Sequence, residues 1–501
     1  MGPAALGLVT LPRSPADVVD ALAMDILMVS AELSPYARET PAAESVASLT
    51  KTLRQVGHDV TLALPRYPGF EAQGLLVARR LSPLQLEDGS ELSVFDGQLP
   101  SGARLVLFDA PESFRRPGVF GEQGKDYSDN PKRMGLFARA TVAWLRERVR
   151  DGQRFDVVHL HDFAAAPVAA ALGADSALPI PNVLTIHDIR RQGDFSARDL
   201  AAVRPLTAPD VEECFKLGSR VNLLKAGIQC TDALATVSTA YAEQLRSEEF
   251  AGALARVIAE SDPPLMGIEN GIDFATHNPA TDPALVSHYT AEDVTNKGRC
   301  KTAVIRQAGL ELDTGRPLVA ASGELTREHG FDLVADAAAS LLKGHVSLVV
   351  AGTPGPGTKR KLAAARKHFA DTFAVIESVD ETLLRRLVAG ADLVLCVDDT
   401  QPFYPAPLIA QRYGALPVAR AAGSVRDIVV DCDAALETGT GFVFRERSSE
   451  ALLAAAQRGL AAIRSPAWSA LRRRVMRRDL GWDRPTRRYL QVYRQAAASR
   501  A

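Results

Sequence analysis

The segment Met24-Asp25-Ile26-Leu27-Met28-Val29 opens a series of short, continuous apolar runs. Runs of this length suit strands that are buried on both faces, as the strands of parallel sheets are. Further runs, each ahead of a turn and a helical pattern, are Val60–Leu64, Leu105–Phe108, Val157–Leu160, Val183–Ile186, Ala233–Val237, Leu318–Ala321, Leu348–Val350, Ala374–Ile376, Leu393–Cys396 and Leu416–Val418. Strands that alternate with helices predict βαβ units, so the expected fold class is α/β.

The runs form two groups that are separated near Asp262-Pro263-Pro264. Two groups predict two doubly wound, Rossmann-like domains that face a cleft. Ligands of such sheets bind at the carboxyl ends of the strands. The expected segments are an N-terminal extension over 1–23, a first domain over 24–262, a second domain over 263–468, and a C-terminal helical segment over 469–501 that crosses back to the first domain.

The last helix is expected to start at Asp483 as its N-cap and to carry an apolar face. Tyr489, Val492 and Tyr493 are spaced at i, i+3 and i+4, so they lie on one side of the helix. That face predicts packing against another part of the chain.

Charge and cysteine content exclude several classes of protein. The 501 residues hold 58 Lys and Arg against 60 Asp and Glu, a net charge of −2, whereas general nucleic-acid binding needs a basic surplus. No apolar run approaches the ~20 residues of a membrane-spanning helix. The five cysteines are scattered, without a C-x-x-C pair or a histidine at metal-ligand spacing. This favours a reduced, cytoplasmic protein without a metal site, and the N-terminal stretch lacks the basic region of a signal peptide.

Polar residues of the first half stand where strands end or helices begin. His161 and His187 each follow an apolar run directly, and Asp129 and Asn130 stand ahead of a predicted helix. His161, and Asp129 or Asn130, also have a structural interpretation as helix caps. Their occurrence together at the loops of one domain favours a binding site there.

Twelve different short motifs follow one another along nearly the whole chain. These are Ile26–Glu32, Val56–Val60, Leu64–Tyr67, Tyr127–Arg133, His159–Asp162, Thr185–His187, Asn222–Gly227, Thr236–Ser238, Asn270–Asp273, Asn278–Asp282, Arg412–Val418 and Thr440–Phe442. From Met24 to about Arg494 the chain thereby resembles bacterial glycogen synthases and plant starch synthases. The resemblance implies a GT-B fold and a retaining glucosyltransferase that extends an α-1,4-glucan from ADP-glucose.

The same resemblance implies roles for individual residues. The first domain would hold the acceptor glucan and the second the nucleotide sugar, with no cofactor and no metal. His161 and Asp129 match the family's positions at the catalytic centre. The positions implied to bind substrate are Arg38, Asn130, Asp162, His187, Asn222, Asn270, Gln401 and Gly423.

The donor side departs from the family pattern in its first loop. Where the family reads Lys-x-Gly-Gly-Leu, this chain reads Arg38-Glu39-Thr40-Pro41-Ala42. Glycines let backbone amides approach a phosphate closely, whereas Pro41 has no N–H and Thr40 adds bulk. Arg38 keeps the positive charge of the lysine.

Three donor elements of the second half also depart from the pattern. In the family's Ser-Arg-Leu-Thr-x-Gln-Lys-Gly, Glu324 replaces the arginine and His329 the lysine. A carboxylate ~4 Å from a phosphate oxygen repels it by up to ~4 kcal/mol at an effective dielectric constant near 20. The family's Glu-Pro-Cys-Gly and Thr-Gly-Gly correspond here to Gln401-Pro402-Phe403-Tyr404 and Ala422-Gly423-Ser424.

The sequence leaves three functions open. The chain is an active glucosyltransferase that uses ADP-glucose, or a glycosyltransferase with another donor, whose diphosphate is held by cations such as Arg327 or Arg38. The third alternative is a catalytically impaired homologue that binds glucan or regulates an active glycogen synthase as its partner. The class that the resemblance favours is a glycosyltransferase of the glycogen synthase type.

Overall fold

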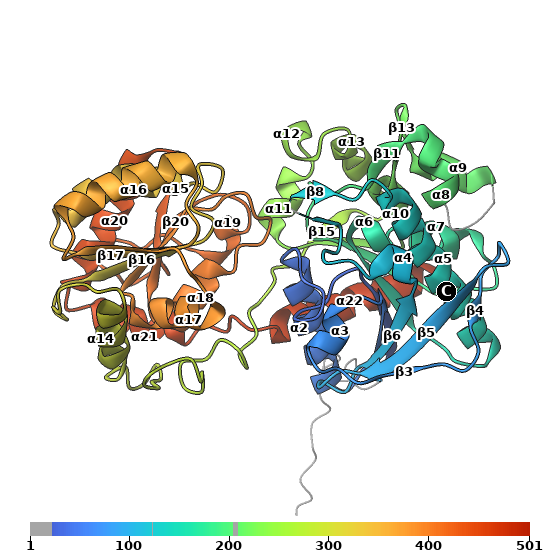
Figure 1. The fold of residues 1–501 in the computed structure, drawn as a ribbon, viewed down its shortest axis with the longest axis horizontal. Coiled ribbons are helices and arrows are strands. Elements are labelled where there is room, and N and C mark those ends of the chain that lie inside the picture. Colours follow the sequence, from blue (N-terminus) through green and yellow to red (C-terminus); the bar gives the residue numbers. More distant parts are fainter. Residues whose placement is uncertain (1–22, 123, 204–208, 501) are drawn as a thin grey trace, which may run out of the picture.

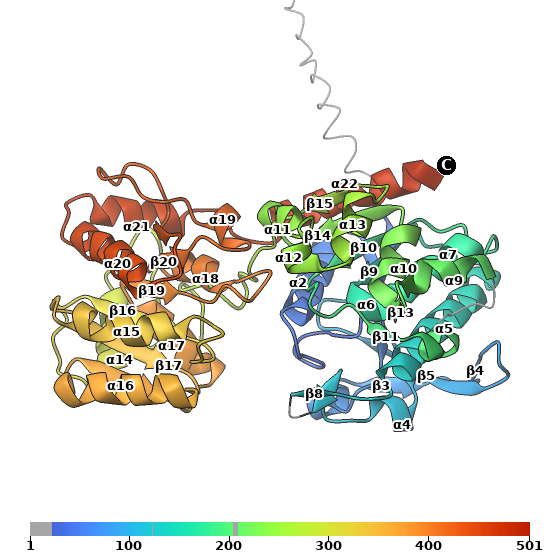
Figure 2. The same ribbon diagram turned by 90° about the horizontal axis from the view of Figure 1, so that it is seen from above.

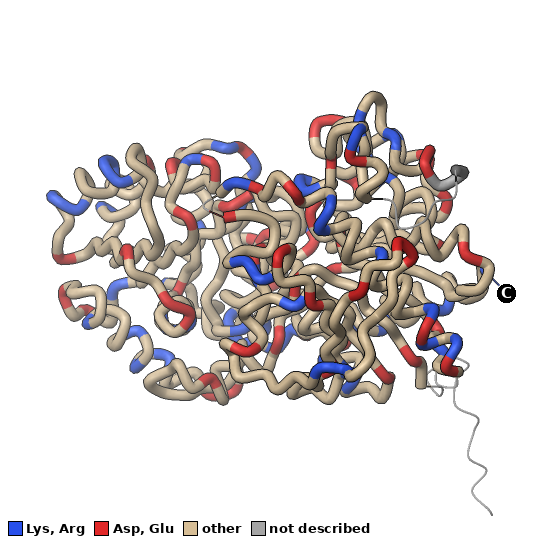
Figure 3. The backbone as a smooth tube through the Cα atoms, turned by 45° about the vertical axis from the view of Figure 1, so that its right-hand side comes forward, with Lys and Arg blue, Asp and Glu red and all other residues tan. Residues whose placement is uncertain are grey.

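The computed structural model describes residues 23–122, 124–203 and 209–500, which form two α/β domains side by side (Figure 1). The N-terminal extension expected over residues 1–23 lies, except for residue 23, outside the described residues. No helix within these ranges has both the length and the apolar character to cross a membrane. Lys and Arg residues are mixed with Asp and Glu residues over both domains (Figure 3).

The first domain is built on a sheet with the strand order β15-β14-β10-β9-β1-β2-β6-β5-β3, and β4 pairs with β5. The strands from β15 to β6 are parallel, while β5 runs antiparallel to β6. The strands are β1 (Asp25–Val29), β2 (Asp59–Pro65), β3 (Val77–Arg79), β4 (Leu84–Gln85), β5 (Glu91–Gln98), β6 (Arg104–Asp109), β9 (Val157–His161), β10 (Asn182–Ile186), β14 (Ala233–Thr236) and β15 (Leu265–Gly267). All six apolar runs predicted as strands in the first half are confirmed.

Helices cover both faces of this sheet (Figure 2). α2 (Ala42–Gln55) packs with the C-terminal helix on one face, and α5 (Asn130–Arg150) packs with α6 (Asp162–Ala165) and α7 (Pro167–Ala174) on the other. The remaining helices and short strands are α3 (Gly69–Ala72), α4 (Pro111–Phe114), β7 (Gly121–Glu122), β8 (Lys125–Asp126), β11 (Asp194–Ser196), a 3-10 turn (Ala197–Asp199), α8 (Leu200–Val203), α9 (Pro209–Phe215), β12 (Lys216–Leu217), β13 (Arg220–Asn222), α10 (Leu223–Cys230), α11 (Thr239–Gln244), α12 (Glu248–Ala251) and α13 (Leu254–Ala259).

The second domain is built on a fully parallel sheet with the order β18-β17-β16-β19-β20-β21. Its strands are β16 (Leu318–Ser322), β17 (Ser347–Ala351), β18 (Phe373–Ile376), β19 (Leu393–Cys396), β20 (Leu416–Arg420) and β21 (Phe442–Phe444). Its helices are α14 (Lys297–Gln307), α15 (Phe331–Leu342), α16 (Pro356–His368), α17 (Glu381–Gly390), α18 (Ala406–Arg412), α19 (Val425–Ile428), α20 (Ser449–Ile463) and α21 (Trp468–Met476). The five runs predicted as strands here are also confirmed.

Two expected domain limits differ from the structure. β15 follows Asp262-Pro263-Pro264, yet it pairs in parallel with β14, so the first sheet extends beyond residue 262. Its three residues are too short an apolar run to show as a strand in the sequence. α21 packs into the core of the second domain through Trp468, Leu471 and Val475, so the crossing does not begin at residue 469.

The helix that crosses back is α22 (Asp483–Arg500) (Figure 2). It packs against β9, β10 and β14 of the first sheet. The expected apolar face is confirmed, because Tyr489, Val492 and Tyr493 are all buried. The last helix of the chain therefore closes one face of the first sheet.

Candidate active site

His161 and His187 meet at the carboxyl ends of two neighbouring parallel strands. His161 is the last residue of β9 and lies opposite Thr185 of β10, and His187 follows the end of β10. The Nδ1 atom of His161 is 3.0 Å from Nε2 of His187, and both side chains are buried. The pairing of β9 with β10 thus joins two residues that are far apart in the sequence.

Burial keeps this histidine pair uncharged. It lowers the pKa of His161 well below its usual value and that of His187 to about 3, because a proton added to either ring would create a cation that water cannot solvate. In a neutral pair, one ring N–H donates to the lone pair of the other ring. The outer atoms, Nε2 of His161 and Nδ1 of His187, are buried and have no partner among the described residues. Two buried, unpartnered ring nitrogens are suited to bind a polar ligand.

A third histidine, His159, supports the pair from behind. Its Nδ1 is 2.9 Å from the Tyr493 hydroxyl and its Nε2 is 2.7 Å from Oγ1 of Thr185. The rings of His159 and His161 are 4.1 Å apart between centroids. Because Tyr493 belongs to α22, the C-terminal helix holds the histidine stack in place. The apolar face of α22 predicted its burial, but no sequence signal revealed this hydrogen bond.

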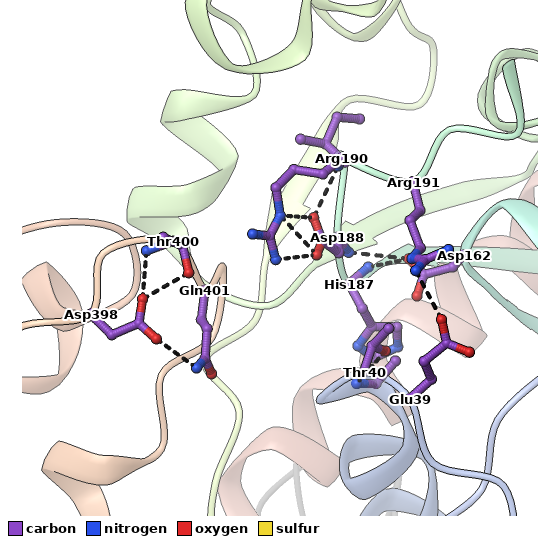
Figure 4. A network of polar contacts seen from close by, with 12 residues as sticks. Glu39, Thr40, Asp162, His187, Asp188, Arg190, Arg191, Asp398, Thr400 and Gln401 are labelled. Atoms are coloured by element: carbon purple, nitrogen blue, oxygen red, sulfur yellow. Dashed lines mark hydrogen bonds and ion pairs between the residues drawn. The ribbon is translucent and has the colours of Figure 1, made fainter. Parts of the chain in front are cut away.

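Asp162 fixes the loop that carries His187. Its Oδ1 accepts the backbone N–H of His187 at 2.6 Å and that of Asp188 at 3.3 Å (Figure 4). Burial raises the pKa of Asp162 well above its usual value. Its backbone is left-handed, with φ of 55°. Asp162 therefore acts on the site through the loop that it holds.

Asp129 is held by an arginine that the sequence analysis did not single out. Arg116 donates from Nη1 and Nη2 to the two carboxylate oxygens at 2.8 and 2.6 Å, which lowers the pKa of Asp129. Asp129 stands at the N-cap position of α5, yet its side chain makes no capping bond, and the side chain of His161 makes none at α6. The two N-cap positions are therefore confirmed, but neither side chain caps its helix, since Asp129 is bonded to Arg116 and His161 to His187.

A cavity of about 570 Å³ lies beside this ion pair. Tyr36, Arg38, Tyr67, Arg116 and Arg191 are among the residues that line it. Aromatic rings next to charged and hydrogen-bonding groups suit a polar ligand with apolar ring faces, as sugars are.

The three asparagines expected to bind substrate make hydrogen bonds within the protein. Asn130 donates to the Phe120 carbonyl oxygen at 2.8 Å, and Asn222 caps α10 by accepting the Lys225 N–H at 2.9 Å. Asn270 donates to the Ser45 hydroxyl at 3.0 Å, while its Oδ1 is buried without a partner among the described residues. Of the three, Asn270 retains a free buried acceptor.

The first donor loop is engaged by the protein itself. Glu32 accepts the backbone N–H groups of Glu39 and Thr40, both at 2.7 Å, and the Thr40 hydroxyl at 2.7 Å. The preceding Arg38 donates to Glu381 at the start of α17 in the second domain, also at 2.7 Å. The amides and the cation that the resemblance assigns to the donor therefore already have partners.

The expected donor positions of the second domain fall into two groups. Gln401 and Gly423 are neighbours, since a Cβ atom at Gly423 would lie 3.4 Å from the Gln401 carbonyl oxygen. Gln401 donates to Asp398 at 2.9 Å (Figure 4). Phe403 and Tyr404 are buried among core residues, so their rings are not displayed on the surface.

Glu324 and His329 form the second group. The Glu324 side chain is 76% exposed, and its carboxylate is 3.7 Å from Nδ1 of His329. The same nitrogen is 2.8 Å from the Thr326 hydroxyl. Neither residue offers a fixed positive charge to a diphosphate.

Arg190 is a cation of the first domain that faces the second domain, and the sequence did not point to it. It follows β10 and is paired with Asp188, whose Oδ1 lies 2.9 Å from the Arg190 Nε atom. Its guanidinium lies on the side of the first domain that faces Asp398 and Gln401 of the second (Figure 4). Its place in the loop that follows β10, at the carboxyl ends of the strands, is the signal that could have found it.

Comparison with known proteins shows the family of the chain. Residues 25–260 match the model of the starch synthase catalytic domain, and residues 305–462 match that of the glycosyl transferases group 1. The glycogen synthase 2 of Geobacter sulfurreducens is 31% identical over 485 residues, covering 95% of this chain and all of that protein. The chain belongs to the glycogen and starch synthase family. The glycogen synthase of Burkholderia thailandensis, 35% identical, covers 93% of this chain and 90% of its own length.

Solved structures of this family confirm the GT-B fold. The catalytic domain of starch synthase IV from Arabidopsis thaliana, bound to ADP and acarbose, has a TM-score of 0.83. It is 26% identical, and the match covers 95% of this chain and all of that domain. Sucrose-phosphate synthase from Thermosynechococcus elongatus shares the fold alone, at 15% identity and a TM-score of 0.56. This member of the glycogen and starch synthase family is therefore a glycosyltransferase by family, with two Rossmann-like domains.

Proposed function

We propose that this chain transfers a glucosyl unit from a nucleotide sugar to an α-1,4-glucan, with retention of configuration, and that ADP-glucose is the donor. The observation that carries the proposal is the pair of buried nitrogens on His161 and His187 that find no partner among the residues the structure describes. They lie at the carboxyl ends of the strands, where ligands of doubly wound sheets bind. The names of the full-length relatives and the ADP and acarbose of the plant homologue support the substrate class.

The first domain is proposed to hold the acceptor. Its cavity of about 570 Å³ is lined by Tyr36 and Tyr67 and by arginines that donate hydrogen bonds. Asp129 beside it stays ionised because Arg116 stabilises its charge. An ionised carboxylate accepts hydrogen bonds from sugar hydroxyls and stabilises positive charge that develops at a sugar carbon. His161, neutral at the strand end, is proposed to contact the transferred sugar.

The second domain is proposed to hold the nucleotide sugar, with Arg190 of the first domain as the cation that faces the donor phosphates. Glu324 and His329 hold no fixed positive charge, and Arg38 is tied to Glu381. Arg190 follows His187 in the same loop, and hydrogen bonding to Asp188 raises its pKa, so it remains fully charged. The bacterial relatives support a cytoplasmic location for this reaction.

A transfer assay tests the proposal directly. Purified full-length protein is mixed with glycogen and ADP-glucose at millimolar concentration, and ADP release is measured beside glucan-bound glucose. Equal amounts of both products are expected. Glucan binding without consumption of any nucleotide sugar across a panel of donors would overturn the proposal and favour the impaired homologue. Consumption of another nucleotide sugar would replace ADP-glucose as the donor.

A further inference from the structure

Two thiols of the first domain lie in contact, away from the histidine pair. Cys214 is in α9 and Cys230 ends α10, and their Sγ atoms are 3.4 Å apart. A disulfide needs a separation of about 2.0 Å, which rotations of the two side chains can supply when the sulfurs already touch. Both residues are partly exposed, so a small oxidant in solution can reach them. The two cysteines are 16 residues apart in the sequence, and no spacing motif marks them.

A lysine holds the two helices in this arrangement. The Nζ atom of Lys225, in α10, donates to the carbonyl oxygens of Glu213 and Cys214 at 2.9 and 3.1 Å. These carbonyls lie at the end of α9, where helix carbonyls lack partners within the helix. Lys225 also donates to Gln229 at 2.6 Å. The backbone of Cys214 is thereby fixed on the helix that carries Cys230.

The pair is chemically distinct from the other three cysteines. The hydrogen bond from the Cys230 thiol and the nearby charge of Lys225 lower the pKa of Cys214. Burial instead raises the pKa of Cys300, Cys396 and Cys432, and that of Cys432 reaches about 11. The thiolate is the reactive form of cysteine, so reaction at Cys214 is favoured over reaction at the buried thiols.

We propose that Cys214 and Cys230 form a thiol–disulfide site that reacts with small disulfides of the glutathione type. The Cys214 thiolate attacks one sulfur of oxidised glutathione, whose S–S bond breaks and releases one glutathione thiolate. The Cys230 thiol then loses its proton and attacks Sγ of Cys214, which releases the second glutathione. The protein loses two protons and two electrons, and one molecule of oxidised glutathione becomes two thiols.

The bond would tie α9 to α10 across the β12–β13 hairpin. Closing this loop restricts the unfolded chain, so the oxidised protein is expected to melt at a higher temperature than the reduced one. The site does not depend on the proposed transfer reaction, because it involves neither His161 nor the donor residues.

Peptide mapping of the native, full-length protein tests this site. The protein is equilibrated in glutathione buffers of increasing oxidation, remaining thiols are alkylated, and peptides are identified by mass spectrometry. We expect one bond, between Cys214 and Cys230, with loss of two of the five thiols and a higher melting temperature. A pair that stays reduced under buffers that oxidise free dithiols overturns the proposal, as does equal reaction of Cys300.

Two variants separate the bond from simple thiol modification. Cys214→Ser and Cys230→Ser should each lose the crosslinked peptide and the rise in melting temperature, and Cys230→Ser should keep a glutathione adduct on Cys214. A rise in melting temperature that persists in either variant would contradict the assigned bond. If a variant fails to fold, the peptide map of the wild-type protein decides the question alone.

Discussion

The Thr40 hydroxyl donates a 2.7 Å hydrogen bond to the buried carboxylate of Glu32. Two backbone N–H groups of the same loop also donate to this carboxylate. A loop that presents its amides to an internal carboxylate has used the donors that a phosphate would need. Thr40, which stands where the resemblance implies a glycine, thus takes part in an internal network.

Glu32 is expected to make stability depend on pH. Burial raises its pKa from the usual 4.5 to about 7, so the folded protein binds this proton more tightly than the unfolded chain does. The contribution of this protonated carboxyl group to the free energy of unfolding is fully present below pH 4.5 and is lost as the pH rises through 7. In Glu32→Gln, the fall of the unfolding free energy between these limits should shrink by about 3 kcal/mol.

Denaturant unfolding at several pH values measures this effect. Glu328→Gln is a suitable control, because it neutralises an exposed glutamate of the second domain that has no part in the Glu32 network. Wild-type protein and Glu32→Gln with parallel pH profiles would show that Glu32 does not titrate in this range.

His161→Ala is expected to remove transferase activity while leaving the fold intact. The change deletes the unpartnered Nε2 atom and leaves His187 without its ring partner. We expect kcat/KM to fall by at least about 100-fold, or about 2.7 kcal/mol of transition-state stabilisation. His368→Ala, on an exposed histidine of α16, should keep full activity. A His161→Ala protein that turns over normally would remove His161 from the catalytic centre.

The double change Glu324→Arg with His329→Lys is expected to raise nucleotide affinity. It replaces an exposed carboxylate and a histidine by two fixed cations at the positions where the resemblance implies that a diphosphate is held. Calorimetry with ADP should show at least about tenfold tighter binding, about 1.4 kcal/mol. Glu328→Arg supplies a similar change of charge at a neighbouring exposed position and should have little effect. An unchanged affinity would mean that these positions do not face the phosphates.

Arg190→Ala is expected to weaken donor binding and spare glucan binding. The guanidinium faces the second domain, so its loss should raise KM for the nucleotide sugar by about tenfold. Arg190→Lys keeps the charge and should recover part of the loss. Arg220→Ala removes an exposed arginine of β13 that is paired with Asp194 of the neighbouring strand β11, and it should match wild type. Equal KM values in all four proteins would exclude Arg190 from the donor site.

The parallel strands could be predicted because burial on both faces leaves a continuous apolar run. β5 was not predicted, since its burial alternates along the strand and its sequence mixes polar with apolar residues. β15 was missed because three residues make no run, and pairing with β14 decides its membership of the sheet. Domain limits are therefore set by which edge a short strand joins, and local sequence does not encode that choice.

Within the site, the sequence pointed to His161 and His187 because each stands at the carboxyl end of an apolar run. It did not reveal that Tyr493 supports them through His159, or that Arg116 holds Asp129. These partners come from distant segments, and a hydroxyl or guanidinium in a helical pattern carries no sign of its partner. The same holds for Cys214 and Cys230, which are isolated in the sequence and come into contact only through the packing of α9 against α10.

The sequence by itself determined the α/β class, the two groups of parallel strands and the family, since apolar periodicity and ordered motifs are local properties. Only the tertiary structure decided which polar atoms remain free for a ligand. Arg38 and the Thr40 amide are engaged by Glu381 and Glu32, whereas Nε2 of His161 has no partner within the described part of the chain. A hydrogen-bonding group binds substrate only if the folded chain leaves it without a partner, and that depends on contacts between segments far apart in the sequence.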